Sequence, residues 1–381
     1  MYQINDGQIT VFGYPDGATL TQMQRTLENE HAAKGVLCAD NHKGYAVPIG
    51  GVVAYREAVS PSGVGFDIGC GNKAVLTDMP GAELRAKIER IMDDVWSTLS
   101  FGVGRKNHET VDAPLFDLPV WKESYAKPLK EKARQQLGTI GSGNHYVDLF
   151  TDEEDRVWIG VHFGSRGFGH GIATYFLKLG GGKDGMDVPP LVLPLNSQIG
   201  HDYLKGMQLA GEYAYAGRTW VCHRVAQLLG ANVLEEVHNH HNYAWAETHQ
   251  GVEYMVIRKG ATPAFPGQRG FVGGSMGESA VIIEGVDSDV SKTALYSTVH
   301  GAGRTMGRNE AKRTIKPEEM SEWLRQKSVT LRGGGLDESP QAYKRLPEVL
   351  GHHEGTIKVL HTLTPVGVAM AGPHEFDPYK D

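Results

Sequence analysis

Five short stretches, four of them rich in glycine, carry residue types that bind metals, and they constrain the fold more than any other feature. The first, residues 60–76 (SPSGVGFDIGCGNKAVL), holds Asp67 and Cys70 between glycines. Glycines let a backbone turn sharply and approach another group closely, so this carboxylate and this thiol can converge on one point. The candidate ligands are spread from Asp67 to His300. Ligands of one site that are so far apart in sequence predict one integrated domain over residues 1–381.

The other four stretches place histidines beside similar turns. Taken singly, each stretch is weak evidence for a metal site, because a lone histidine at a strand end is more often a structural residue. The stretches are GTIGSGNHYVD with Asn144 and His145, GVHFGSRGFGH with His162, VHNHHNYAWAE with His238, His240 and His241, and STVHGAGRTMGR with His300.

Taken together, the stretches supply five ligands: Asp67, Cys70, His145, His162 and either His240 or His241. Five ligands are too many for one closed tetrahedral site. They suit two ions that share a bridging thiolate and keep open positions for substrate oxygens. Oxygen, nitrogen and sulfur donors together fit Mn, Zn, Co or Fe. Two neighbouring metals indicate phosphoryl chemistry, because they can hold the attacking and leaving oxygens together.

A separate histidine is surrounded by cations. His300 is followed by Arg304, Arg308, Lys312 and Arg313. A histidine among phosphate-binding cations near a metal pair can act as a nucleophile on phosphorus. The alternative is a basic surface loop next to a core histidine, and this segment alone leaves both interpretations open.

Composition excludes several classes of protein. The chain has 40% hydrophobic and 22% charged residues, which is typical of a soluble globular protein. A net charge of −7 argues against a general basic surface, so any nucleic-acid contact must come from a local patch. Three cysteines argue against a disulfide framework and favour a reducing cytoplasm. We expect neither a signal peptide nor a transmembrane helix.

The apolar periodicity predicts an α+β fold, because helices and strands do not alternate regularly. We predict strands at 45–55, 72–77 and 157–163, helices at 81–99, 199–229 and 317–327, a long loop at 178–198 and a closing strand pair at 356–371.

Nine motifs in order give the chain a family likeness: NHKGYAVPIGG, GVGFDIGCG, GTIGSGNH, VHFGSRGFGH, HHNYAWAE, RKGATPA, GGSMG, VHGAGR and DESPQAYK. In these motifs the chain resembles the RtcB family of RNA ligases. That resemblance implies a single large domain with mixed sheets around a dinuclear metal cleft. It also implies joining of RNA 3′-phosphate or 2′,3′-cyclic-phosphate ends to 5′-hydroxyl ends, with GTP and two Mn²⁺ ions.

The resemblance assigns roles to the candidate ligands. Cys70 would bridge both Mn²⁺ ions, with Asp67 and His145 completing one site. His162 and His241 would complete the other, because the family ligand directly precedes an asparagine, here Asn242.

The nucleotide would be held by a second group of residues. His300 would attack the α-phosphate of GTP and carry GMP. The resemblance assigns Asn144 and Arg304 to phosphate, Asp148 and Ser275 to guanine edges, Tyr343 to base stacking, Asn242 to the cofactor-binding set and Arg166 to RNA phosphate.

The chain departs from the family in two places. Met370 stands at or beside a position where the family often has a lysine that reaches guanine, and Asp148 is one carbon shorter than the usual glutamate. We expect a monomer acting on RNA ends, and an archease-type activator is implied only by the resemblance. The substrate stays open between tRNA splicing and RNA repair. The alternatives are a two-metal phosphoesterase or nuclease acting on RNA ends, and a metal-dependent RNA-binding factor without turnover.

Overall fold

Two large mixed sheets form the framework of the protein. The computed structural model describes residues 1–373 and 375. Within these residues the first sheet has six strands, in the order β1 (Tyr2–Ile4), β2 (Ile9–Val11), β3 (Ala32–His42), β4 (Ile49–Tyr55), β12 (Val252–Lys259) and β11 (Asn242–His249). The β2–β3 pair is parallel and the other pairs are antiparallel.

The second sheet has eight strands in the described part of the chain. Its order is β10 (Val233–His240), β6 (Gly71–Pro80), β8 (Arg156–Phe163), β7 (Tyr146–Thr151), β18 (Ile357–Met370), β15 (Ala280–Gly285) and β14 (Arg269–Val272), and β17 (Thr330–Arg332) pairs in parallel with β18. Two small ribbons pair β13 (Ala261–Pro263) with β16 (Ser297–Val299) and β5 (Ala58–Val59) with β9 (Leu193–Pro194).

Helices cover the sheets and fill the connections. The α-helices are α1 (Gly17–Thr26), α2 (Pro61–Val64), α3 (Gly81–Thr98), α4 (Lys130–Gln136), α5 (Arg166–Leu179), α6 (Gln198–Leu229), α7 (Asp289–Thr293), α8 (Arg308–Thr314), α9 (Pro317–Gln326) and α10 (Leu346–Gly351). The 3₁₀ turns are η1 (Pro114–Asp117), η2 (Pro119–Lys122), η3 (Lys127–Leu129), η4 (Leu336–Glu338) and η5 (Pro340–Ala342). No helix within the described residues is both long and apolar enough to cross a membrane.

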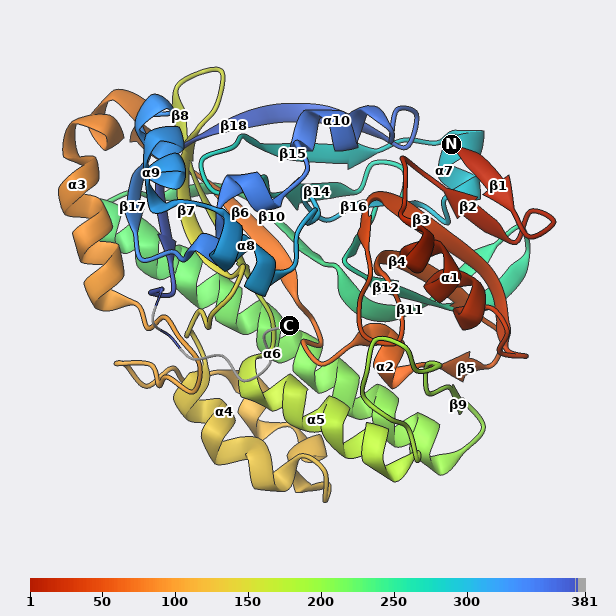
Figure 1. Cartoon of the computed structure of the whole chain (residues 1–381). Coiled ribbons are helices and arrows are strands. Elements are labelled where there is room, and N and C mark those ends of the chain that lie inside the picture. The colour runs from red at the N-terminus through yellow and green to blue at the C-terminus, as the bar shows by residue number, and fades with distance from the viewer. Residues whose placement is uncertain (374, 376–381) are drawn as a thin grey trace.

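Helix α6 joins the hydrophobic cores of the two sheets, and Figure 1 shows it running beneath them. The Ser197 side chain caps its first turn by accepting from the backbone of Gly200, and Gly230 ends it in a left-handed conformation with φ of 67°. Tyr203 and Met207 pack in the core under the six-stranded sheet. The C-terminal half of the helix packs under the eight-stranded sheet. The helix predicted at 199–229 is therefore confirmed, and its buried residues belong to the core.

The α+β class predicted from the sequence is confirmed, and most predicted elements lie within a few residues of the observed ones. The predicted strand pair at 356–371 is wrong. These residues form the single strand β18, which pairs first with β15 and then with β7. The chain shifts register in both pairings and so bends between its two partners instead of turning back.

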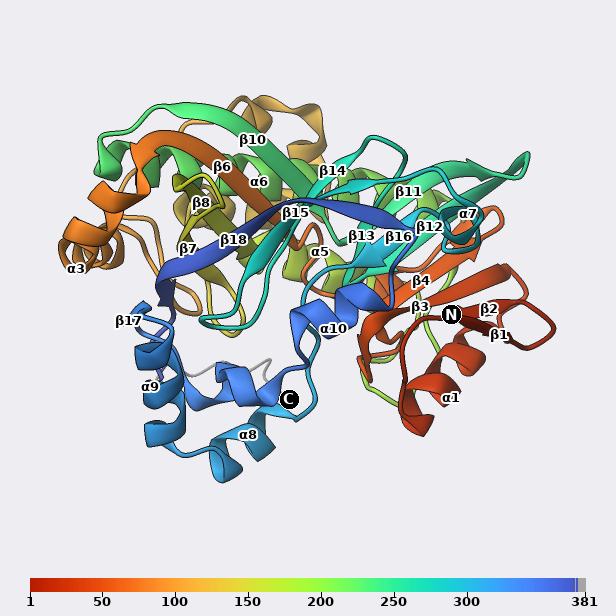
Figure 2. The same cartoon turned by 90° about the horizontal axis from the view of Figure 1, so that it is seen from above.

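The segment containing α8 and α9 and the region around α1 project from the same side of the sheets, as Figure 2 shows. Both regions supply residues to the cavity described below.

Candidate active site

Four of the predicted ligand segments meet at one end of the eight-stranded sheet. Cys70 directly precedes Gly71, the first residue of β6, and Gly71 pairs with Phe163 of β8, the residue after His162. On its other side Gly71 pairs with His240, the last residue of β10, which directly precedes His241. His145 directly precedes β7, whose first residue pairs with His162. Strand register therefore brings together ligands that are far apart in sequence.

The converging segments line a cavity of about 530 Å³. Arg166 is the one predicted site residue outside its lining, and its guanidinium lies 3.1 Å from Nδ1 of His145. The other predicted residues all line the cavity: Asp67, Cys70, Asn144, His145, Asp148, His162, His241, Asn242, Ser275, His300, Arg304 and Tyr343.

A thiol and two imidazoles form the centre of the ligand group. Cys70 Sγ lies 3.8 Å from Nε2 of His145 and 3.7 Å from Nε2 of His162. Asp67 Oδ2 lies 3.1 Å from Nε2 of His145. The rings of His162 and His241 are stacked with centroids 5.0 Å apart. These donors are of the mixed kind that borderline divalent metals accept.

A hydrogen bond sets the orientation of one of these rings, and another ring has a nitrogen without a partner among the described residues. Nδ1 of His162 lies 2.6 Å from Oδ1 of Asn72. An amide oxygen only accepts, so the ring proton sits on Nδ1 and the Nε2 lone pair faces Cys70. Nδ1 of His241 is buried and has no hydrogen-bond partner among the described residues. A buried unpaired nitrogen is uncommon and fits a ligand-binding position.

Burial makes the imidazoles neutral. It lowers the pKa of His162 and His241 well below the usual value and also lowers that of His145. Burial alone would raise the pKa of Asp67, but its contact with His145 lowers it to about 2. Burial raises the pKa of the Cys70 thiol well above its usual value. Neutral imidazoles and an ionised carboxylate are ready for a cation, whose charge would favour the thiolate.

Two glycines leave space for functional side chains. A Cβ at Gly164 would collide with the carboxylate of Asp67. A Cβ at Gly141, where φ is +96°, would collide with the guanidinium of Arg166. These close approaches explain why the ligand stretches are rich in glycine.

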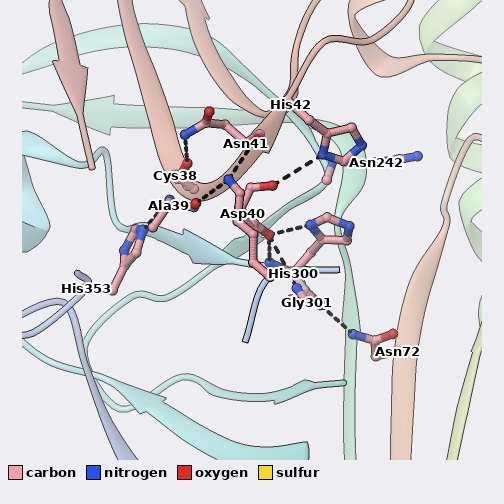
Figure 3. A network of polar contacts seen from close by, with 12 residues as sticks. Cys38, Ala39, Asp40, Asn41, His42, Asn72, Asn242, His300, Gly301 and His353 are labelled. Atoms are coloured by element: carbon pink, nitrogen blue, oxygen red, sulfur yellow. Dashed lines mark hydrogen bonds and ion pairs between the residues drawn. The ribbon is translucent and has the colours of Figure 1, made fainter. Parts of the chain in front are cut away.

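His300 lies across the cavity with its ring held by a buried carboxylate (Figure 3). Asp40 Oδ2 accepts from the backbone N–H of His300 at 2.9 Å and lies 2.6 Å from its Nδ1. The rings of His300 and His241 are 4.9 Å apart at their centroids. Asp40, which was not predicted, directly precedes the NHKGYAVPIGG motif.

The end of strand β3, which carries Asp40, is anchored by two residues from the other end of the chain. His353 Nε2 accepts from the backbone N–H of Ala39 at 3.0 Å. Lys344 donates to the carbonyls of Ala39 and Asn41 at 2.9 and 2.8 Å. Sequence reasoning missed both anchors, because each acts on backbone atoms that carry no side-chain signal.

The cations after His300 are paired with a buried acid. Arg304 stacks over the Tyr343 ring at 4.9 Å and donates to its hydroxyl at 2.9 Å. Glu338 contacts Arg304 at 3.4 Å and also hydrogen-bonds Arg308 and Tyr343. Arg304 and Arg308 therefore line the cavity, whereas Lys312 and Arg313 are exposed on α8. The interpretation as a basic surface loop is wrong for the first two cations and holds for the other two.

The opposite wall is built around Asp148. This carboxyl is buried, its Oδ1 lacks a hydrogen-bond partner within the described chain, and burial raises its pKa well above the usual value. Ser275 donates to Glu278 at 3.2 Å, and Met370 lines the same wall. Asn242 accepts from the backbone of Gly260 at 2.7 Å and so anchors the turn beside His241. A ligand with hydrogen-bond donors would satisfy Asp148.

The chain is similar to known proteins over most of its length. The model of the family "tRNA-splicing ligase RtcB" matches residues 22–124 and 118–371. The chain is 31% identical over 361 residues to the RNA-splicing ligase RtcB of Escherichia coli (strain K12), covering 86% of this chain and 87% of that protein. It is 29% identical over 453 residues to the tRNA-splicing ligase RtcB of Thermococcus kodakarensis, covering 93% of each.

Proposed function

Because the chain belongs to the RtcB family of RNA-splicing ligases, we propose that it joins RNA 3′-phosphate or 2′,3′-cyclic-phosphate ends to 5′-hydroxyl ends through a His300–GMP intermediate. The proposal treats residues 1–381 as one ligase domain that uses GTP and Mn²⁺. The observation that carries it is the placement of His300, held by Asp40, in the same cavity as the Cys70, His145 and His162 cluster.

The metal part of the proposal rests on donor chemistry. Cys70 would contact two Mn²⁺ ions, with Asp67 and His145 on one and His162 and His241 on the other. The neutral imidazoles and the unpaired Nδ1 of His241 fit this use. Bound metal would offset negative charge on the phosphates. Asn72 would fix the His162 ring so that Nε2 faces the ion.

The nucleophile is the other part of the proposal. With Nδ1 of His300 hydrogen-bonded to Asp40, the Nε2 lone pair is the free one. Nε2 attacks the α-phosphorus of GTP, a P–N bond forms, and the bond to the leaving pyrophosphate breaks. Asp40 stabilises the positive charge that the ring gains in this step.

The remaining cavity residues would hold the nucleotide and the RNA. Asn144 and Arg304 would bind phosphate, Asn242 would belong to the cofactor-binding set, and Asp148 and Ser275 would contact guanine edges. Tyr343 would stack on the base, and Arg166 would bind RNA phosphate. GMP then passes from His300 to the RNA 3′-phosphate, and the 5′-hydroxyl attacks that activated end and releases GMP.

The proposed setting is the cytoplasm, where the protein acts as a monomer on RNA ends. An archease-type activator is the partner protein that family membership suggests.

The test is mass spectrometry of the intact protein after incubation with GTP and Mn²⁺. The proposal expects a covalent GMP adduct on His300 that is absent from His300→Ala. The same variant should still join an RNA that already carries a 3′-terminal GMP cap. A two-metal phosphoesterase or nuclease would form no adduct, so an unmodified wild-type protein would favour that function.

A further inference from the structure

A fully buried arginine lies directly behind the Cys70 turn, and none of the proposed roles uses it. Arg218, on α6, is 0% exposed. A buried charge is costly unless hydrogen bonds and opposite charge compensate it. The contacts of Arg218 therefore indicate what its charge does.

One nitrogen of Arg218 connects two ligand segments. NH1 donates to the carbonyl of Gly69 at 2.8 Å and to that of Phe163 at 2.5 Å. Gly69 directly precedes Cys70, and Phe163 directly follows His162. A single guanidinium nitrogen thus holds the backbone of both ligand-bearing segments.

The other nitrogens reach a third segment, the end of β10. Arg218 Nε donates to Nε2 of His238 at 2.8 Å, and NH2 lies 2.9 Å from Nδ1 of His240. His240 directly precedes His241. A guanidinium only donates, so His238 accepts from it as a neutral imidazole. Nδ1 of His240 lies between Arg218 and the carbonyl of Gly69, which is 3.0 Å away. The two histidines that are not proposed ligands are thereby explained as partners of Arg218.

The charge of Arg218 lies behind the Cys70 turn. No carboxylate in the described part of the chain forms an ion pair with it, and every hydrogen bond that it makes there is to a carbonyl or an imidazole. The guanidinium carbon also lies 5.4 Å from the centre of the Tyr215 ring, and burial lowers the pKa of Arg218 to about 10. A positive charge without a carboxylate partner among the described residues can offset the negative charge that the Cys70 segment gains when its thiol binds a metal ion.

The glycines on both sides of Cys70 allow this close contact. A Cβ at Gly69 would lie 3.1 Å from Cβ of Ala214 and 3.2 Å from Cα of Gly211, both on α6. A Cβ at Gly71 would lie 3.1 Å from NH2 of Arg218 and would collide with the backbone of β10. Larger residues would move the turn away from Arg218.

We propose that Arg218 is a positioning residue for the metal centre. It holds the Cys70 turn, the end of β8 and the end of β10 in ligand-binding geometry, and it balances the charge of the ligands. The inference rests on the proposed function, because it presupposes that Mn²⁺ binds these ligands. Arg218 touches neither substrate nor metal in this role.

The experiment measures Mn²⁺ binding to the purified metal-free protein by the EPR signal of free Mn²⁺. Arg218→Met removes the charge and the donors at similar length, and we expect binding weaker by about 10- to 100-fold. Arg218→Lys keeps the charge but lacks the planar fork, so we expect an intermediate loss. Thermal unfolding of each variant shows whether it is folded.

The matched control is Arg258→Met. Arg258 is also 0% exposed, but it pairs with Glu247 at 2.6 Å and donates to Ser297 at 2.9 Å. This variant should lose thermal stability and keep wild-type Mn²⁺ affinity.

Three outcomes would overturn the inference. Wild-type affinity in a folded Arg218→Met or, if that variant does not fold, in Arg218→Lys would show that the arginine does not position the ligands. An equal loss of affinity in Arg258→Met would mean that any buried arginine has the same effect. Absence of Mn²⁺ binding by the wild type would remove the proposed function itself and is therefore distinguishable from the other two.

Discussion

The carboxylate of Asp40 holds His300 at two atoms, the backbone N–H at 2.9 Å and the ring Nδ1 at 2.6 Å. The side chain of Asp40 is completely buried, so this contact is shielded from water. Burial alone would raise the pKa of Asp40, but the charge and hydrogen bonds of His300 lower it. Asp40 therefore stays ionised and fixes the tautomer that leaves Nε2 of His300 free to attack.

Asp40→Asn should abolish most nucleotide transfer while keeping the shape of the site. An asparagine can turn its amide N–H toward Nδ1 of His300, which would place the ring proton on Nε2. Loss of the correct tautomer reduces the rate on the order of 10³- to 10⁴-fold. The measurement is the rate of labelled GMP transfer from GTP to the protein, with Mn²⁺ content as the control for folding. A rate within about threefold of wild type would mean that Asp40 does not orient the nucleophile.

Cys70→Ala should remove both metal ions at once, because one sulfur lies next to both His145 and His162. The expected result by elemental analysis is a protein that retains neither Mn²⁺ ion and no longer accepts GMP. Cys222→Ala is the matched control, since Cys222 is a buried cysteine in the core beneath the eight-stranded sheet. One retained ion in Cys70→Ala would show that the thiol does not bridge.

His353 should make the protein sensitive to mild acid. Burial lowers its pKa from 6.5 to about 4, and its neutral Nε2 accepts from Ala39. Between pH 4 and pH 6.5, the His353 ring is mostly protonated in the unfolded chain and mostly neutral in the folded chain. The free energy of unfolding should therefore fall as the pH drops below 6.5, with about 2 kcal/mol from this group at pH 5.

The measurement for His353 is urea unfolding at pH 7.5 and pH 5. His353→Gln can still accept from Ala39 but cannot titrate, so the difference between the two pH values should shrink by about 2 kcal/mol. An equal difference in both proteins would assign the acid sensitivity to other groups.

The ligand stretches were predictable because each one carries chemically distinctive side chains, which in four of the five stretches stand beside glycines. Asp67, Cys70 and His162 stand in such stretches, and strand register brings them together. Asp40 and Asn72 were missed because each acts on a histidine that is remote in sequence. The sequence does not show that such a polar residue contacts a histidine, because the two come together only in the folded chain.

The strand pair predicted at 356–371 failed for a local reason. The segment contains Pro365 and Gly367, which are typical of turns. In the structure the register shift falls between Pro365 and Gly367, so these residues form an irregularity within one strand. Tertiary pairing with β15 and β7 decides between a turn and a bulge, and the sequence alone carries no signal for it.

Met370 lies on the wall of the cavity proposed to hold the base. On β18 it pairs with Tyr146, and Val368, two residues earlier, pairs with Asp148. Met370 and Val368 therefore face the same side of the sheet, and both line the cavity with Asp148. The thioether can accept only a weak hydrogen bond and donates none.

Met370→Lys should widen the preference for GTP over ATP. A lysine there could donate to O6 and N7 of guanine, whereas adenine presents an amino group in place of O6. A hydrogen bond to a charged group contributes about 1.5–3 kcal/mol, which corresponds to about 10- to 150-fold in the ratio of the two rates. The measurement is covalent nucleotide transfer with each triphosphate, with Met370→Leu as the control that changes shape but adds no donor. Because Asp148 remains in all three proteins, GTP should stay preferred throughout. A ratio that is the same for lysine, leucine and methionine would show that this position does not face the base.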